Sequence, residues 1–263
     1  MPTNNIMIKF FRKIRQNLLS EGKTGKYLKY AIGEIILVVI GILIALSINN
    51  WNEIRKNKLT EHEYYCKLLA DFDLDRKNIA QLYEECNYRI NISKKLLLDL
   101  LKMDKDKSYL LDNYIQALRI DAFVPSKATI TDIISSGSLN LLTNDSLKNS
   151  IVRYYAELDK FLYQLEINQS GALERAFSYD DDLQFGFQYA DYVKKSLGPE
   201  IMKTLPTNDW QLDSDSKYYK QYQNDLVNFV INSERIKQHF DNILKAMEPT
   251  YNQLKVECSS NKK

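Results

Sequence analysis

Glycine, proline, cysteine and histidine are all scarce in this chain of 263 residues, which holds 8, 5, 3 and 2 of them. Few glycines and prolines leave few positions for tight turns, so a β-sandwich or barrel is disfavoured and long helices are favoured. The glycines are scattered and form no phosphate-binding loop, and neither histidine lies in a recognisable catalytic motif. We therefore expect an all-α fold, no cofactor and no enzymatic activity. Paired carboxylates of the glycosidase kind stay open, because a helical domain rich in acids offers such pairs by chance.

The three cysteines, Cys66, Cys86 and Cys258, show neither CxxC nor zinc-finger spacing. Two interpretations stay open. In the favoured one, all three are unpaired thiols. In the other, Cys66 and Cys86 form a disulfide bond, which requires an oxidising compartment.

The charge balance differs between the two ends of the chain. Residues 1–30 carry seven Lys and Arg against one acid, whereas residues 52–263 carry 29 Lys and Arg against 32 Asp and Glu. The basic excess thus belongs to the N-terminal arm. We therefore expect no nucleic-acid partner for the large C-terminal part, which lacks the positive charge that phosphate binding requires.

One long apolar run stands out at residues 31–48, AIGEIILVVIGILIALSI, and Glu34 is its sole ionisable residue. As a helix it would be about 27 Å long, close to the hydrocarbon thickness of a bilayer. Tyr30 before it and Trp51 after it are aromatic residues of the kind found at membrane interfaces. Lysines 23, 26 and 29 precede it, so the positive-inside rule predicts a cytoplasmic N-terminus and a C-terminal domain on the far side. We predict one transmembrane helix at residues 31–49, with the lipid bilayer as its partner.

Two other interpretations of the apolar run are weaker. Ala45-Leu46-Ser47 fits the small-x-small pattern of a signal-peptide cleavage site, but about thirty residues would precede the apolar part, more than such peptides have. A buried helix of a soluble protein would not explain why basic residues gather on one side of the run.

Two features within the run concern packing and charge. Gly41 and Ala45 form a small-xxx-small step, which lets two helices approach closely and suggests a homodimer. Glu34 lies near the cytoplasmic boundary, where its carboxylate can extend to the interface or pair with Lys29 or Lys26. The alternative is a functional role, which intramembrane carboxylates often have.

The N-terminal arm has apolar residues at helical spacing and basic residues between them. The apolar residues are Ile6, Phe10, Phe11, Ile14 and Leu18, and the basic ones are Lys9, Arg12, Lys13 and Arg15. This pattern is typical of a helix that lies on an anionic membrane surface. A solvated basic tail is the alternative.

The rest of the chain has the spacing of packed helices. Apolar residues recur at alternating steps of three and four in residues 65–100, 147–172 and 219–247. Shorter helices are expected at residues 110–120, 127–135 and 185–196, and a loop at residues 206–215. Gly137 is typical of a helix C-terminus, and Thr143 or Asn144 of the next N-cap. The 18 tyrosines favour ordinary core packing over a tyrosine-lined ligand cleft.

Three groups of residues imitate metal sites. His62 and Cys66 have the spacing of a zinc-binding helix, but a third ligand is missing. Asp71, Asp73 and Asp75 alternate as at the start of a calcium loop, but the turn glycine and the final glutamate are absent. The acidic run at residues 180–182 could gather a hard cation. We favour solvated or structural roles for all three groups, and hence no metal site.

Two segments carry a family resemblance. They are GEIILVVIGILIALSINNWNE at residues 33–53, preceded by the basic arm, and TITDIISSGSLNLLTNDSLKNSIVRYY at residues 129–155. They resemble an uncharacterised family of single-pass membrane proteins from Gram-negative bacteria. The resemblance implies an inner-membrane address with a periplasmic domain, and it carries over no activity.

We therefore predict an all-α protein with one N-terminal transmembrane helix followed by a helical bundle of three long helices plus shorter ones. Its segments are a basic cytoplasmic arm (1–30), the transmembrane helix (31–49), a periplasmic bundle (50–258) and a disordered tail (259–263). The leading functional hypothesis is an interaction or sensing domain with an envelope protein as partner. The alternatives are a structural or assembly subunit of an envelope complex and, less favoured, a metal-dependent enzyme.

Overall fold

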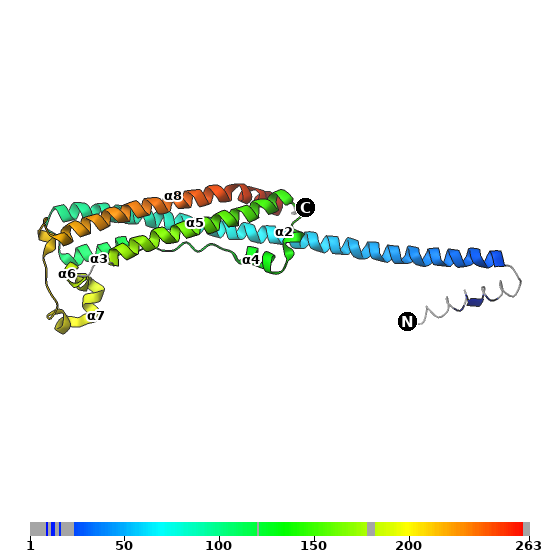
Figure 1. Ribbon diagram of the computed structural model, residues 1–263, viewed down its shortest axis with the longest axis horizontal. Helices are drawn as coiled ribbons and strands as arrows, with labels where there is room; N and C mark the ends of the chain where they lie inside the picture. Colours follow the sequence, from blue (N-terminus) through cyan, green and yellow to red (C-terminus); the bar gives the residue numbers. More distant parts are fainter. Residues whose placement is uncertain are drawn as a thin grey trace. The chain divides into compact units, whose positions relative to one another are not determined.

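The structure, a computed structural model, describes residues 9, 12–13, 16, 24–119, 121–177 and 182–259 (Figure 1). Within these residues every regular element is a helix and no strand occurs, so the predicted all-α class is confirmed. The chain divides into two compact units, residues 1–60 and 61–263. Helix α2 (Thr24–Leu101) begins in the first unit and ends in the second.

In the first unit, α2 carries the apolar run with its side chains exposed. Leu37 is 67% exposed and Ile44 is 55% exposed. The run contains no proline, so nothing removes a helical hydrogen bond within it. Among the described residues, one helix is long and apolar enough to cross a membrane, and it is α2. Its most apolar window of 18 residues has a mean hydropathy of 2.8, and none of these residues is buried.

The second unit contains the rest of α2 and two more long helices, α5 (Asp145–Phe177) and α8 (Lys217–Ser259). Both lie where the spacing of apolar residues predicts long helices. The shorter elements are α3 (Lys107–Leu118), α4 (Ala128–Ser135), η1 (Ser138–Leu141), α6 (Asp182–Phe185), η2 (Phe187–Tyr189), α7 (Asp191–Met202) and η3 (Trp210–Leu212). Helix α2 continues through the predicted boundary between residues 49 and 50. Of the predicted tail, residues 260–263 lie outside the described residues.

The predicted helix at residues 185–196 is wrong, because this stretch is divided among α6, η2 and α7. Gly186 has φ 105°, a conformation that an α-helix cannot include. Gly198 has φ 78° and breaks α7 just before Pro199, as the Gly-Pro pair predicts. The predicted loop at residues 206–215 contains the short helix η3.

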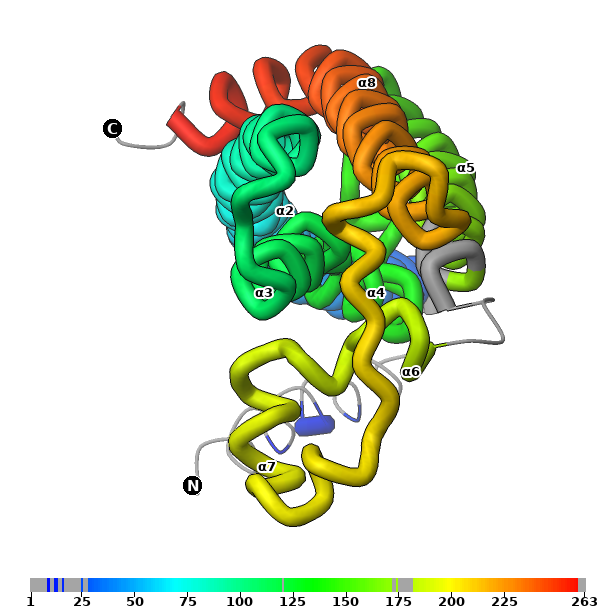
Figure 2. Tube along the Cα trace, turned by 90° about the vertical axis from the view of Figure 1, so that its left-hand side faces the viewer, coloured from blue at the N-terminus to red at the C-terminus, as the bar shows by residue number. Residues whose placement is uncertain are grey.

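Helices α2, α5 and α8 run side by side (Figures 1 and 2). Helices α2 and α8 are antiparallel. Cys66, near the start of the second unit, is bonded to Cys258 near the end of α8. At the opposite end, the Tyr219 hydroxyl donates to the carbonyl of Leu100 at 3.4 Å.

Helices α5 and α8 are also antiparallel. Ser150 Oγ lies 2.6 Å from Thr250 Oγ1, and further along α5 Asn168 Nδ2 lies 3.0 Å from His239 Nε2. Helix α4 lies near the start of α5, whereas α3, α6 and α7 gather at the other end of the unit (Figure 1). Residues 121–127 have no regular structure and lead to α4.

Two clusters of buried side chains fill the second unit. Core 1 contains residues of α2, α4, α5 and α8 and two residues between helices, Phe123 and Leu142. Its members are Tyr65, Leu68, Phe72, Ile79, Cys86, Phe123, Ile130, Ile133, Leu142, Leu147, Ile151, Tyr154, Tyr155, Leu158, Leu165, Ile236, Phe240, Ile243, Met247 and Leu254. Core 2 contains residues of α2, α3, α6, η3 and α8, namely Ile92, Leu96, Leu100, Leu110, Leu111, Tyr114, Ala117, Leu118, Phe185, Trp210, Tyr218, Tyr219, Tyr222, Leu226 and Phe229. Each large side chain contributes about 1.5–3 kcal/mol by leaving water. The packing of these apolar side chains does not explain the polar groups at the boundary between the two cores.

Candidate functional site

The residues singled out in the apolar run lie on α2. Gly41 and Ala45 are exposed, and no heavy atom lies within 4 Å of a Cβ built on Gly41. Glu34 is half-buried. Trp51 is 66% exposed, and the guanidinium of Arg55 lies 5.8 Å from the centre of its ring. No described residue therefore fills the space beside Gly41.

Of the basic residues in the N-terminal arm, Lys9, Arg12 and Lys13 are helical and exposed. Arg15 lies outside the described residues. The helical state of the three described residues agrees with the spacing of apolar and basic side chains in the arm.

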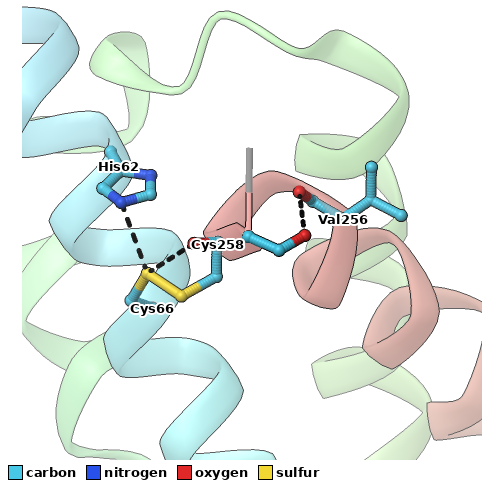
Figure 3. The surroundings of a disulfide bond; sticks show 5 residues. His62, Cys66, Val256 and Cys258 are labelled. Atoms are coloured by element: carbon cyan, nitrogen blue, oxygen red, sulfur yellow. Dashed lines mark hydrogen bonds between the residues drawn. A yellow bond between two sulfur atoms is a disulfide. The ribbon is translucent and has the colours of Figure 1, made fainter. Parts of the chain in front are cut away.

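A disulfide bond joins Cys66 of α2 to Cys258 of α8, 192 positions later, with the two Cα atoms 5.1 Å apart (Figure 3). The predicted Cys66–Cys86 pair is therefore wrong, and so is the interpretation of three unpaired thiols. Cys66 and Cys86 lie twenty residues apart on one helix, or about 30 Å, whereas a disulfide requires Cα atoms within about 7 Å. Cys86 is a free thiol buried in core 1, and burial raises its pKa.

The disulfide also removes the zinc hypothesis for His62 and Cys66, because a bonded sulfur is not a thiolate ligand. His62 Nε2 lies 3.7 Å from Cys66 Sγ, one helical turn away (Figure 3). This contact places the imidazole against the disulfide.

Polar contacts around the disulfide tie the start of α5 to the neighbouring helices. Glu61 is buried and accepts hydrogen bonds from the hydroxyls of Tyr65 at 3.0 Å and Thr143 at 2.9 Å, and from the Thr143 N–H. Asn144 Nδ2 donates to Glu257 Oε1 at 2.7 Å, and Asn144 Oδ1 accepts from the Leu147 N–H at 3.1 Å. Asn144 is therefore the N-cap of α5.

The two remaining metal hypotheses concern Asp71, Asp73 and Asp75 and the acidic run at residues 180–182. Asp71 and Asp75 accept backbone N–H groups of Thr129 and Ser126, at 3.2 and 2.7 Å, whereas Asp73 accepts the Tyr251 hydroxyl. The three carboxylates thus serve separate contacts. Of the acidic run, residues 180 and 181 lie outside the described residues. In the part of the chain that the structure describes, no group of three or more His, Cys, Asp and Glu is placed to hold a metal.

Asp75 of α2 is a fully buried carboxyl, three residues after Phe72 of core 1. Its Oδ1 accepts the Ser126 N–H, while Oδ2 has no hydrogen-bond partner among the described residues. The hydroxyls of Tyr154 and Tyr155 are also buried without a partner there. Burial raises the pKa of Asp75 to about 6. Folding is thus opposed by the ionised form of this residue at neutral pH.

A cavity of about 220 Å³ lies at the boundary between the two cores. Its walls come from α2, from the C-terminal end of α3 with the residues that follow, and from α8. On α2, the residues that line the cavity run from Leu82 to Arg89. Cys86 among them belongs to core 1, and Ile92 of core 2 follows three residues after Arg89. Tyr88 and Asp121, both exposed, lie at its rim.

Arg89 is the most buried charged residue in this cavity wall, with an exposed fraction of 4%. Its Nε donates to the carbonyl of Ala117 at 3.0 Å, which satisfies an orphan carbonyl at the end of α3. Its Nη2 is buried and has no partner among the described residues. Burial lowers the pKa of this guanidinium.

Burial of Arg89 was not predicted from the sequence, although one signal for it is present. Cys86, Arg89, Ser93 and Leu96 follow one another at steps of three and four, so a charged residue occupies the apolar stripe of α2. Earlier on the same helix, Asp75 is buried while Arg76 beside it is exposed. Two ionisable residues of the stripe were therefore missed.

One family model, described as "Family of unknown function (DUF6090)", matches residues 34–178, which is more than half of the chain. The match contains the segment at residues 129–155 and all but the first residue of the segment at residues 33–53. The resemblance to an uncharacterised family is confirmed to that extent. No curated protein and no solved structure matches the chain.

Proposed function

This chain belongs to the DUF6090 family of unknown function, and from that premise we propose that it is a single-pass inner-membrane protein with a periplasmic helical bundle. The bundle, built on α2, α5 and α8, acts in interaction or sensing. Its N-terminal arm is cytoplasmic and lies on the membrane surface through its basic residues. The protein carries out no chemical reaction of its own.

The Cys66–Cys258 disulfide is the observation that carries this proposal. Disulfides persist in oxidising compartments such as the periplasm and are rare in the cytosol. The bond lies in the second unit, after the apolar run. It therefore supports a location for residues 61–259 on the oxidising side, in agreement with the seven basic residues that precede the run.

The exposure of the apolar part of α2 supports the bilayer as its partner. A core helix of a soluble protein would be buried, whereas none of the most apolar 18-residue window is buried here. The signal-peptide interpretation would require cleavage at Ala45-Leu46-Ser47, inside a helix that continues to Leu101.

The anchor itself supports a second copy of the chain as a partner. Gly41 and Ala45 favour a homodimer through the anchor, because small residues permit close helix approach.

The topology is tested by fusing a periplasm-active phosphatase, and separately a cytoplasm-active fluorescent protein, to the C-terminus of the full chain. We expect phosphatase activity and no fluorescence. The converse pattern would refute the periplasmic location. The Cys258→Ser variant, run beside the wild type on a non-reducing gel, checks that the disulfide forms in the cell.

The role is tested by gentle detergent extraction and mass measurement of the complex. A homodimer that dissociates on Gly41→Leu substitution, with Val39→Leu on the opposite face of the helix as the control, supports the proposed anchor contact. A stable complex with other envelope proteins would instead favour a structural or assembly subunit.

A further inference from the structure

The cavity at the boundary between core 1 and core 2 combines a buried cation with apolar walls. Arg89 lies in its wall, and only one of its guanidinium nitrogens, Nε, has a hydrogen-bond partner among the described residues. Leu82, Ile236 and Phe240 supply apolar surface. This is the composition of small-molecule sites, in which a few polar groups orient a ligand within apolar walls.

No carboxylate among the described residues forms an ion pair with Arg89. Of the two acids in the cavity wall, Glu85 accepts a hydrogen bond from Gln81 Nε2 at 3.0 Å, and Asp121 is exposed at the rim. A buried charge without a counter-charge is costly, and the cost falls when an anion pairs with it. Solvent screens Asp121, so it opposes such an anion weakly.

Capping of α3 uses one of the hydrogen-bond donors of the Arg89 guanidinium and does not explain why a charged group is buried here. The Ala117 carbonyl takes one of five N–H donors, and a neutral amide side chain could serve the same carbonyl without a buried charge. A second guanidinium, that of Arg119, lines the same cavity and donates to Gln116 Oε1 at 3.4 Å. Arg119 and Gln116 are exposed on the α3 side of the cavity, so solvent screens Arg119 as it screens Asp121, and the buried guanidinium of Arg89 is the donor that suits a planar oxyanion.

We propose that this cavity binds a small organic carboxylate, with the carboxylate paired to Arg89 and the apolar part against Phe240 and Ile236. The volume of about 220 Å³ is below the usual range for drug-sized ligands, so the ligand is a short-chain acid. This inference rests on the sensing role proposed above and names the ligand class for it. The walls come from α2, α3 and α8, so a ligand here contacts the helices of both cores.

Binding is tested on the full chain in a non-ionic detergent by thermal unfolding with sodium butyrate. Butyramide is the neutral match, and sodium chloride and inorganic phosphate at equal ionic strength are the anion controls. At a hundredfold excess over Kd we expect Tm to rise by about 5 °C or more with butyrate and to stay unchanged with the controls. No shift with butyrate, or an equal shift with butyramide, chloride or phosphate, would overturn the proposal.

The site is assigned with Arg89→Met, which removes the charge, and Arg153→Met, an exposed arginine of α5, as the matched control. The butyrate shift should vanish in the first variant and persist in the second. An unchanged shift in Arg89→Met would overturn the proposal.

A second measurement needs no variant. Cys86 lines the cavity and is the single free thiol of the chain, so its maleimide labelling is read directly by intact mass. At a tenfold excess over Kd, butyrate should slow labelling about tenfold and butyramide should not. Equal labelling rates would overturn the proposal. Both assays use purified protein in detergent, so their failure leaves the topology result untouched.

Discussion

Loss of the Cys66–Cys258 bond should strongly destabilise the second unit. The bond closes a loop of 192 positions, which spans nearly all of that unit. Constraint of so long a loop in the unfolded chain corresponds to about 5 kcal/mol in the chain-entropy model. Domains of this kind have about 5–15 kcal/mol of stability in total, so a third or more should be lost.

The perturbations are Cys258→Ser and, separately, reduction of the wild-type protein with dithiothreitol. Circular dichroism of the full chain in detergent should show Tm lower by about 10–20 °C in both cases, since each kcal/mol corresponds to about 2–4 °C in a protein of this size. Dithiothreitol should have no further effect on Cys258→Ser, because Cys86 is already a free thiol.

A loss of stability below about 1 kcal/mol would refute this reasoning. It would mean that the hydrogen bonds from Thr143 to Glu61 and from Asn144 to Glu257 already hold this end of the unit together in the absence of the disulfide. It would also mean that the unfolded chain gains little freedom when the bond is cut.

Three further substitutions test the core and the turns. Asp75→Asn should raise the free energy of unfolding in urea by up to about 3 kcal/mol at pH 7.5 and leave it unchanged near pH 4. The control, Glu84→Gln on the exposed side of α2, should change the free energy of unfolding little at either pH. The sign follows because the folded-state pKa of about 6 lies above the unfolded value, so wild-type stability falls as pH rises from about 4 through 6. Gly137→Ala should destabilise by about 1 kcal/mol in the same assay, because φ is 70° there, while Gly171→Ala inside α5 should stabilise by a similar amount; equal signs would contradict the conformational argument. Trp210→Phe should lower the unfolding free energy by about 1–2 kcal/mol, because the indole N–H donates to a backbone carbonyl of α6 at 2.7 Å and the phenyl ring cannot; an unchanged value would assign the contribution of Trp210 to packing alone.

Local chemistry was enough to predict the helices and several of their ends. The apolar run, the steps of three and four, an N-cap at Thr143 or Asn144 and a helix end at Gly137 each depend on residues within a few positions of one another, and the structure assigns the cap to Asn144. Gly186 shows where this failed. It has a positive φ, and a Cβ added there would come within 3.1 and 3.5 Å of side-chain atoms of Lys107 and Leu111 of α3, which lie at least 75 positions earlier in the chain.

The sequence by itself determined the all-α class, the apolar helix and the long helices, because each depends on side chains that recur along a single helix. The tertiary structure alone decided which cysteines pair and which charged residues are buried. Cys66 meets Cys258 because α2 and α8 are antiparallel, and Arg89 is enclosed because α3 ends against α2. Both outcomes depend on how distant helices are packed, and packing energy is shared among side chains that are far apart in the sequence.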